Sequence, residues 1–147
     1  MGEYRWAYED PDDWEPLSEL YRIAPLGTKP PEYLSVVFPG SRYKCLVHDG
    51  DELVGAGRAV ADGLDVAYIA DVAVHPDHQG RGLGGAIIRE LVRLAQGHRK
   101  IVLYANPGTE GFYERLGFHH MRTAMAIFED AERAVETGVL ERRPSSP

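Results

Sequence analysis

Three glycines alternate with other residues in the segment Gln79-Gly80-Arg81-Gly82-Leu83-Gly84. Glycine has no side chain to keep a ligand away, so the backbone N–H groups of such a segment approach an anion closely. The segment follows a strand-like run that ends at Val74 and opens a helix-like run, and a helix N-terminus adds about half an elementary positive charge. Arg81 adds a full charge. These residues predict a cradle for a diphosphate, against the alternative of a glycine-rich connection without a ligand.

Two nucleotide-binding motifs fit this segment poorly. A Walker A loop needs Lys followed by Ser or Thr after its glycines, and here Gly84-Gly85-Ala86 follows instead. A dinucleotide fingerprint has an acidic residue at the end of the next strand, about 20 positions later, to bind a ribose. The next strand-like run ends in Tyr104-Ala105-Asn106, which is not acidic. A different phosphorylated cofactor is therefore favoured.

Strands and helices must position this cradle. Apolar and β-branched runs predict strands at 4–8, 43–48, 53–61, 65–74, 100–105 and 118–128. Capping signals and apolar spacing predict helices at 14–21, 32–38, 83–95 and 109–116. Turns containing Asp-Gly separate the strands between 43 and 74, which indicates an antiparallel meander. The fold class is mixed α/β.

Composition excludes several classes of partner. The 147-residue chain has a net charge of -7 and a pI near 5.3, so it lacks the positive field of a nucleic-acid-binding protein. No apolar run approaches the roughly 20 residues that cross a bilayer, and the N-terminus lacks a secretory pattern. Cys45 is alone, and His75, His78 and His119-His120 lack further metal ligands at suitable spacing. We expect a cytoplasmic protein with no metal, no membrane contact and no nucleic acid.

Two segments together resemble the GCN5-related N-acetyltransferase (GNAT) family. Gln79 to Gly84, after Val72-Ala73-Val74-His75-Pro76, is similar to the family's motif for the pyrophosphate of coenzyme A. Tyr104 to Asn106, followed by Glu110 to Phe118, is similar to its second signature. The resemblance covers roughly residues 4–128. It implies a mostly antiparallel mixed sheet with about four helices and splayed fourth and fifth strands, in a domain 1–128 with a partly disordered extension, 129–147.

The resemblance also implies site residues for acetyl-CoA. Backbone groups of Val72 to Val74, with Ala73 between them, would bind the acetyl carbonyl and the pantetheine arm. Asn106 would lie beside the pantetheine, and Tyr113 near the sulfur. The segment around the diphosphate would comprise Gln79, Gly80, Arg81, Gly82, Leu83 and Gly84.

The chemistry of acetyl transfer adds catalytic candidates. An amine that attacks a thioester drives negative charge onto sulfur, and a phenol with a pKa near 10 can protonate a thiolate whose thiol pKa is near 8.5. Tyr113 is therefore the predicted general acid, with aromatic packing as the alternative. Asp71 is the leading candidate for the base, although strand alternation also allows it to point away from the substrate. Tyr68 is an alternative that would orient a water molecule.

The acceptor is less constrained by the sequence. The two N-terminal helices offer aromatic residues, among them Tyr33, that suit a hydrophobic amine or simply fill the core. Leu53 to Gly63 resembles the corresponding segment of plant and cyanobacterial serotonin acetyltransferases. We expect transfer to a primary amine, small and aromatic, by direct attack in a ternary complex. Alternatives are a protein lysine or N-terminal acetyltransferase and a non-catalytic coenzyme A sensor, and the family resemblance leaves a homodimer open.

Overall fold

The computed structural model describes residues 3–144 and divides the chain into two compact units. The first ends at Leu103 and the second begins at Tyr104. The predicted domain boundary at residue 128 stays a prediction. Among the helices of residues 3–144, none combines the length and apolar character needed to cross a membrane.

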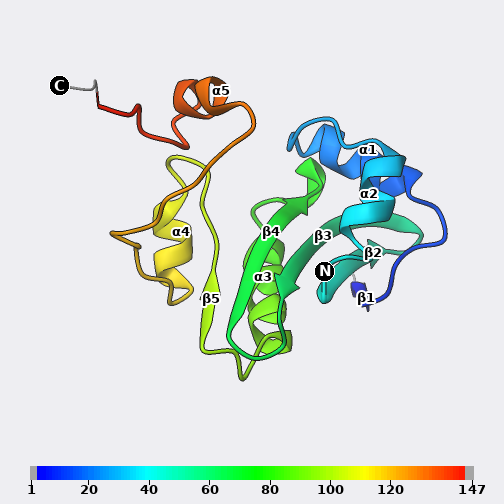
Figure 1. The fold of residues 1–147 in the computed structure, drawn as a ribbon. Helices are drawn as coiled ribbons and strands as arrows, with labels where there is room; N and C mark the ends of the chain where they lie inside the picture. Colours follow the sequence, from blue (N-terminus) through cyan, green and yellow to red (C-terminus); the bar gives the residue numbers. More distant parts are fainter. Residues whose placement is uncertain (1–2, 145–147) are drawn as a thin grey trace. The chain divides into compact units, whose positions relative to one another are not determined.

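The first unit is built on a five-stranded sheet in the order β1-β2-β3-β4-β5 (Figure 1). Neighbouring strands are antiparallel except β4 and β5, which are parallel. The predicted meander and the mixed fold class are confirmed. The strands are β1 (Arg5–Ala7), β2 (Tyr43–Asp49), β3 (Glu52–Ala61), β4 (Val66–Val74) and β5 (Lys100–Val102).

Helices α1 (Glu15–Ile23) and α2 (Pro31–Val37) pack on one face of this sheet. Both begin with proline in the first turn, where its missing N–H costs no hydrogen bond. Their apolar side chains form a core with residues of β2, β3 and β4. This core contains Leu17, Leu20, Tyr21, Leu34, Phe38, Leu46, Ala56 and Ala73.

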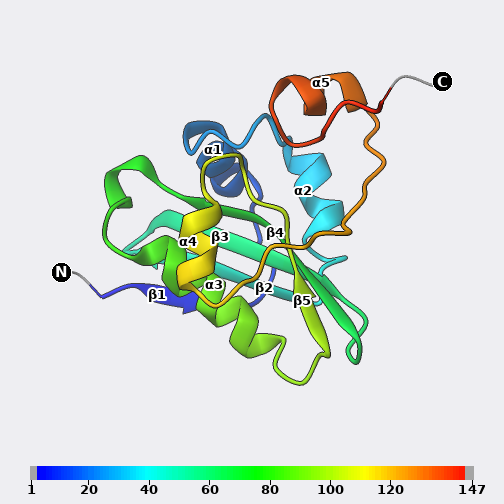
Figure 2. The ribbon, with the colours of Figure 1, turned by 90° about the vertical axis from the view of Figure 1, so that its left-hand side faces the viewer.

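Helix α3 (Leu83–Leu94) packs on the opposite face (Figures 1 and 2). Gly55 and Gly57 flank Ala56 on β3, so their face of the strand is the one that α1 and α2 do not cover. A Cβ added at Gly57 would lie 2.9 Å from Ile87 and 3.0 Å from Leu91. The two glycines therefore let α3 approach the sheet closely.

The second unit contains helices α4 (Glu110–Arg115) and α5 (Ala131–Glu136). The predicted strand at 118–128 is wrong: this segment is irregular, and Met125 and Ile127 are fully exposed. Strand propensity alone does not form a strand, because a strand needs a neighbour for its backbone hydrogen bonds. Helix α5 was not predicted, although the Asp130 side chain accepts a hydrogen bond from the Arg133 N–H at its start. The predicted partial disorder of 129–147 stays a prediction, and residues 145–147 lie outside the described residues.

Candidate active site

A β-bulge interrupts β4 next to the predicted base. Arg58 pairs with Ala70 and Ala56 pairs with Ala73, so three steps along β4 match two steps along β3. Asp71 and Val72 therefore both lie opposite Gly57. Asp71 has a φ of +57°, the one positive φ among the non-glycine residues that the structure describes. Aspartate tolerates this left-handed conformation better than most residues do, and a bulge of this kind changes the direction of the side chain.

The bulge places Ala70 and Asp71 on the same face of the sheet, and Val72 on the other. A Cβ on Gly57 would lie 3.2 Å from Val72 Cγ2, so Val72 points toward α3. Asp71 points toward α1 and α2, where Arg58 Nε donates a 2.8 Å hydrogen bond to its Oδ2. The Tyr21 hydroxyl donates to the Asp71 backbone carbonyl over 2.6 Å. The predicted base is thus directed away from the face that carries α3.

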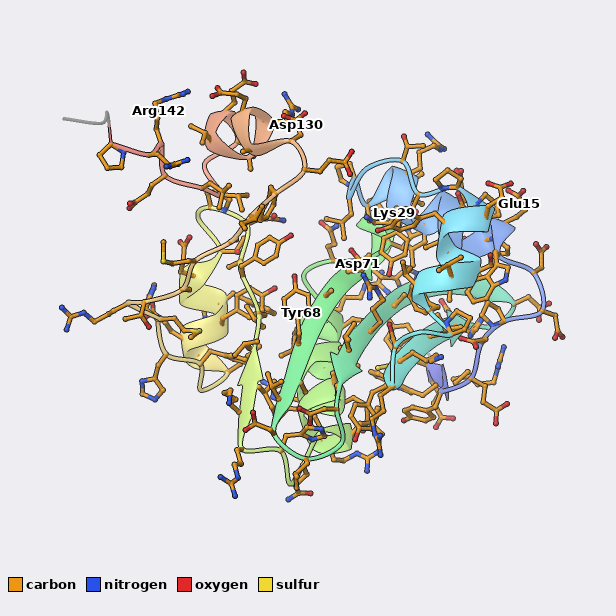
Figure 3. All side chains as sticks on the ribbon, in the orientation of Figure 1. Glu15, Lys29, Tyr68, Asp71, Asp130 and Arg142 are labelled. Atoms are coloured by element: carbon orange, nitrogen blue, oxygen red, sulfur yellow. The ribbon has the colours of Figure 1, made fainter. Side chains whose placement is uncertain are left out.

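Lys29 completes this group and was missed by the sequence reasoning. Its Nζ lies 3.5 Å from Asp71 Oδ1, and Figure 3 shows the two residues together beside β4. The same Nζ lies 5.6 Å from the centre of the Tyr21 ring and 5.7 Å from that of Tyr33. Such distances allow cation–π attraction. Lys29 belongs to the connection between α1 and α2, which contains prolines and a glycine and gave no periodic signal.

The Lys29, Arg58 and Asp71 side chains form a small group, which we call the charge cluster. They are 17%, 13% and 17% exposed, respectively. Arg58 also donates a 3.2 Å hydrogen bond to Ser41 Oγ. Two positive charges therefore share one carboxylate. Burial and the Asp71 charge together hold the pKa of Tyr21 well above its usual value, so that its phenol stays protonated.

Strand β4 is only briefly paired with β5. The pairing joins Val66, Ala67 and Tyr68 to Lys100, Ile101 and Val102, whereas β4 continues to Val74. The paired stretch of β4 and β5 therefore ends at Tyr68, before the bulge. Tyr68 and Ala70 lie two residues apart, so Tyr68 shares the sheet face of the charge cluster (Figure 3).

The glycine-rich segment connects β4 to α3 as the sequence predicted. Gly80 and Gly82 have φ values of +78° and +79°, and added Cβ atoms would meet open space at both. The conformation, and not crowding, favours glycine there. The Gln79 side chain donates to the Val74 carbonyl over 3.1 Å, and Arg81 is exposed.

The N-terminus of α3 suits an anion. Gly82 is its N-cap, with no side-chain hydrogen bond and no acidic residue in the first turn. The first helical hydrogen bond runs from the Ala86 N–H to the Gly82 carbonyl. The N–H groups of Leu83, Gly84 and Gly85 therefore have no carbonyl acceptor within the helix. These amides, the two positive-φ glycines and Arg81 fit the diphosphate of coenzyme A.

A short 3₁₀ turn, Pro76–His78, fixes this segment to the sheet. His78 is 6% exposed, and its Nδ1 lies 2.9 Å from the Tyr4 hydroxyl. The His75 N–H donates to the Val54 carbonyl over 2.8 Å. Both histidines thus have structural partners.

Tyr113 and Asn106 belong to the second unit. The Tyr113 ring makes edge contacts with Phe112 and Phe118, at centroid distances of 5.0 and 5.9 Å. Burial raises the pKa of its phenol above the usual value of 10.0. The Asn106 carbonyl accepts hydrogen bonds from the Thr109 N–H and hydroxyl, which leaves its exposed side chain out of this turn.

Comparison with known proteins places this geometry in a family. The model described as "Acetyltransferase (GNAT) family" matches residues 3–118. An uncharacterized N-acetyltransferase, ycf52, of Pyropia yezoensis is 45% identical over 69 residues, which are 46% of this chain and 40% of that protein. The chloroplastic serotonin N-acetyltransferase 2 of rice is 45% identical over 67 residues, 44% of this chain and 34% of the relative. The matches thus span well under half the length of these curated relatives.

Solved structures agree on the fold. A probable acetyltransferase of Staphylococcus aureus has a TM-score of 0.77 at 23% identity, over 86% of this chain and 98% of the other. Glucosamine-6-phosphate N-acetyltransferase of Arabidopsis thaliana has a TM-score of 0.66 at 16% identity, over 87% and 99% of the two chains. At these identities the likeness shows the fold alone. From the family match over residues 3–118, the chain belongs to the GNAT family of acetyltransferases.

Proposed function

We propose that the chain transfers an acetyl group from acetyl-CoA to a small primary amine by direct attack in a ternary complex. One observation carries the proposal: β4 contains the bulge that presents a carboxylate, and a short turn and the positive-φ glycines connect it to a helix N-terminus without a side-chain cap. One strand thus connects a group that can act on an amine to a cradle that suits a diphosphate.

The cradle is the proposed site of the coenzyme. Residues 79–84 and the first amides of α3 would hold the diphosphate, with Arg81 neutralising its charge. The backbone of Val72 to Val74, beyond the paired part of β5, would hydrogen-bond the acetyl carbonyl and the pantetheine arm. Acetyl-CoA supplies the activated acetyl group. Asn106 is proposed to bind the pantetheine through its side-chain amide.

Asp71 is the proposed residue for the amine. Arg58 holds Oδ2 at 2.8 Å and Lys29 Nζ lies 3.5 Å from Oδ1, so Oδ1, the more loosely held oxygen, is the one proposed to meet the acceptor amine. The role is to orient the acceptor and to accept its proton, directly or through water that Tyr68 would orient. Tyr33 is 45% exposed and offers a ring face for an aromatic acceptor. The name of the rice relative, a serotonin N-acetyltransferase, supports an aromatic amine.

Tyr113 is the proposed acid for the sulfur. Its pKa is raised by burial, so the phenol keeps its proton at neutral and moderately alkaline pH. A protonated phenol can donate to the thiolate that leaves when the thioester breaks.

Release of free coenzyme A from acetyl-CoA tests the function. Purified protein is assayed with arylalkylamines, polyamines, amino sugars, amino acids and lysine peptides, and coenzyme A binding is measured by calorimetry. Turnover with arylalkylamines supports the proposal, and turnover with lysine peptides alone replaces the small amine by a protein substrate. Coenzyme A binding without turnover points to a sensor. Absence of binding overturns the proposal.

A further inference from the structure

The chain contains three lysines, and their surroundings differ sharply. Lys44 Nζ makes two hydrogen bonds, to Asp10 Oδ1 at 2.8 Å and to the Phe38 carbonyl at 2.7 Å. Lys100 Nζ pairs with Asp65 at 2.9 Å, and its side chain is 56% exposed. Lys29 Nζ is held less tightly, by the 3.5 Å ion pair with Asp71 and by two tyrosine rings. Of the three, Lys29 alone places its amine at the bulge.

The surroundings of Lys29 Nζ match what an acceptor amine needs. A carboxylate oxygen lies close enough to take a proton after a small movement, and two aromatic rings keep the ammonium beside it. The Ser18 hydroxyl donates to the Lys29 carbonyl over 2.7 Å, which fixes the backbone and leaves the side chain to move. The carboxylate belongs to the residue that precedes Val72, the proposed contact of the acetyl group.

We propose that Lys29 Nζ is itself an acetyl acceptor, modified by acetyl-CoA bound to the same chain. This inference rests on the proposed function. The ammonium loses a proton to Asp71, and its lone pair forms a bond with the thioester carbonyl carbon. The bond from that carbon to sulfur then breaks. One of the two protons that nitrogen loses ends on the coenzyme A thiolate and the other in solvent, so the products are N-acetyl-lysine and free thiol.

Acetylation of Lys29 would lower the net charge of the charge cluster by one. Lys29 and Arg58 share the Asp71 carboxylate, so the cluster carries one surplus positive charge before the reaction. Acetylation leaves a neutral amide between the Tyr21 and Tyr33 rings. The remaining pair, Arg58 with Asp71, is neutral overall, and Asp71 Oδ1 is then available to an external amine.

Mass spectrometry of the full chain, incubated with acetyl-CoA, tests this proposal. The expected result is the gain of one acetyl group, mapped to the peptide that contains Lys29, at a rate independent of protein concentration. Uncatalysed acetylation follows exposure, so it would label Lys100, at 56%, before Lys29, at 17%. Preferential labelling of Lys29 therefore requires the folded site, and urea-unfolded protein should lose that preference.

Two matched variants complete the test. Lys29→Arg keeps the positive charge beside Asp71 and should abolish the labelling, whereas Lys100→Arg should leave it unchanged. Labelling of Lys29 that is no faster than that of Lys100, or that accelerates with protein concentration, overturns the proposal. External-amine turnover in a sample whose Lys29 stays unmodified throughout incubation with acetyl-CoA overturns this inference alone. Absence of coenzyme A binding overturns the proposed function and this inference with it.

Discussion

Arg58 Nε lies 2.8 Å from Asp71 Oδ2, beside the point where β4 carries one residue more than β3. The contact fixes a carboxylate that stands on a left-handed backbone, and both of its oxygens have a cationic neighbour. Asp71 therefore holds two cations in place, and it is also the proposed base. Substitutions at this position should affect stability and turnover together.

Asp71→Asn tests this double role, because asparagine also tolerates a positive φ. Removing the charge leaves Arg58 and Lys29 without their anionic partner. We expect the free energy of unfolding to fall by about 1–3 kcal/mol, measured by urea denaturation. The value of kcat/KM should fall by about 10²-fold or more if the carboxylate takes the proton.

Asp65→Asn is the matched control. It breaks the exposed pair with Lys100, and exposed pairs contribute about 0–1 kcal/mol. Equal losses of stability in the two variants would contradict the structural role of Asp71. Unchanged turnover of Asp71→Asn would remove it from the chemistry.

Tyr113→Phe should lower kcat by about 10²-fold or more while coenzyme A still binds, because the phenol is lost and the ring remains. Burial raises the pKa of this phenol above its usual value of 10.0. In the protein without substitutions, the loss of activity caused by deprotonation of Tyr113 should therefore begin only at a pH above 10.0. Steady-state kinetics across pH and calorimetry check both points. Tyr8→Phe, which removes a hydroxyl bonded to Glu90, should leave kcat unchanged. An equal loss in both variants would contradict the assignment.

Gly82→Ala tests the diphosphate cradle. Alanine at a φ of +79° costs about 1–2 kcal/mol, and relaxation of the backbone would redirect the first amides of α3. We expect a weaker affinity for coenzyme A, measured by calorimetry. Gly97→Ala is matched, since Gly97 has a φ of +100° and open space around its Cβ position. It should cost similar stability without changing the affinity, and full affinity in Gly82→Ala would refute the cradle.

Stability should decline in alkali. Burial raises the pKa of Cys45 to about 12 and that of Tyr21 well above its usual value. Between pH 9 and pH 12 the unfolded chain therefore binds fewer protons than the folded one, and the free energy of unfolding falls as pH rises, by about 1.4 kcal/mol per pH unit for each such proton. Urea titrations at neutral pH and at about pH 10 measure the decline. Cys45→Ala should make it shallower, and an identical slope would contradict the raised pKa.

Truncation of two apolar residues, one buried and one exposed, should affect stability to very different extents. Leu91 is fully buried under the sheet, so Leu91→Ala should cost about 2–5 kcal/mol in urea denaturation. Ile127 is fully exposed, so Ile127→Ala should change the free energy of unfolding by no more than about 0.5 kcal/mol. A large loss for Ile127→Ala would mean that a surface covers this residue in solution.

Local patterns in the sequence predicted most of the elements of the first unit. Alternating apolar residues and Asp-Gly turns act between near neighbours, so the ranges of β2, β3 and β4 agree with the prediction within about two residues. The strand prediction for 118–128 was wrong because this segment pairs with no neighbouring strand among the described residues. Helix α5 was missed because its charged composition obscured the cap at Asp130.

The conformation of the glycine-rich segment was predictable because it depends on residue types that are adjacent in the chain. The charge cluster was not, since Lys29 and Asp71 are brought together by packing of the connection between α1 and α2 against β4. For Asp71, the alternation of side chains along the strand could not decide which face of the sheet the carboxylate occupies. The answer depends on the bulge, for which a single sequence offers no signal.

The bulge also has an evolutionary consequence. Ala70 and Ala73 occupy the same face of β4 although an odd number of steps separates them, so the strand changes phase between them. Deleting Val72 would restore regular alternation and allow the same five-stranded sheet, but Asp71 would then lie opposite Gly57 and turn away from Arg58. A gain or loss of activity among relatives can therefore arise from the insertion or deletion of one residue, with every glycine of the cradle retained.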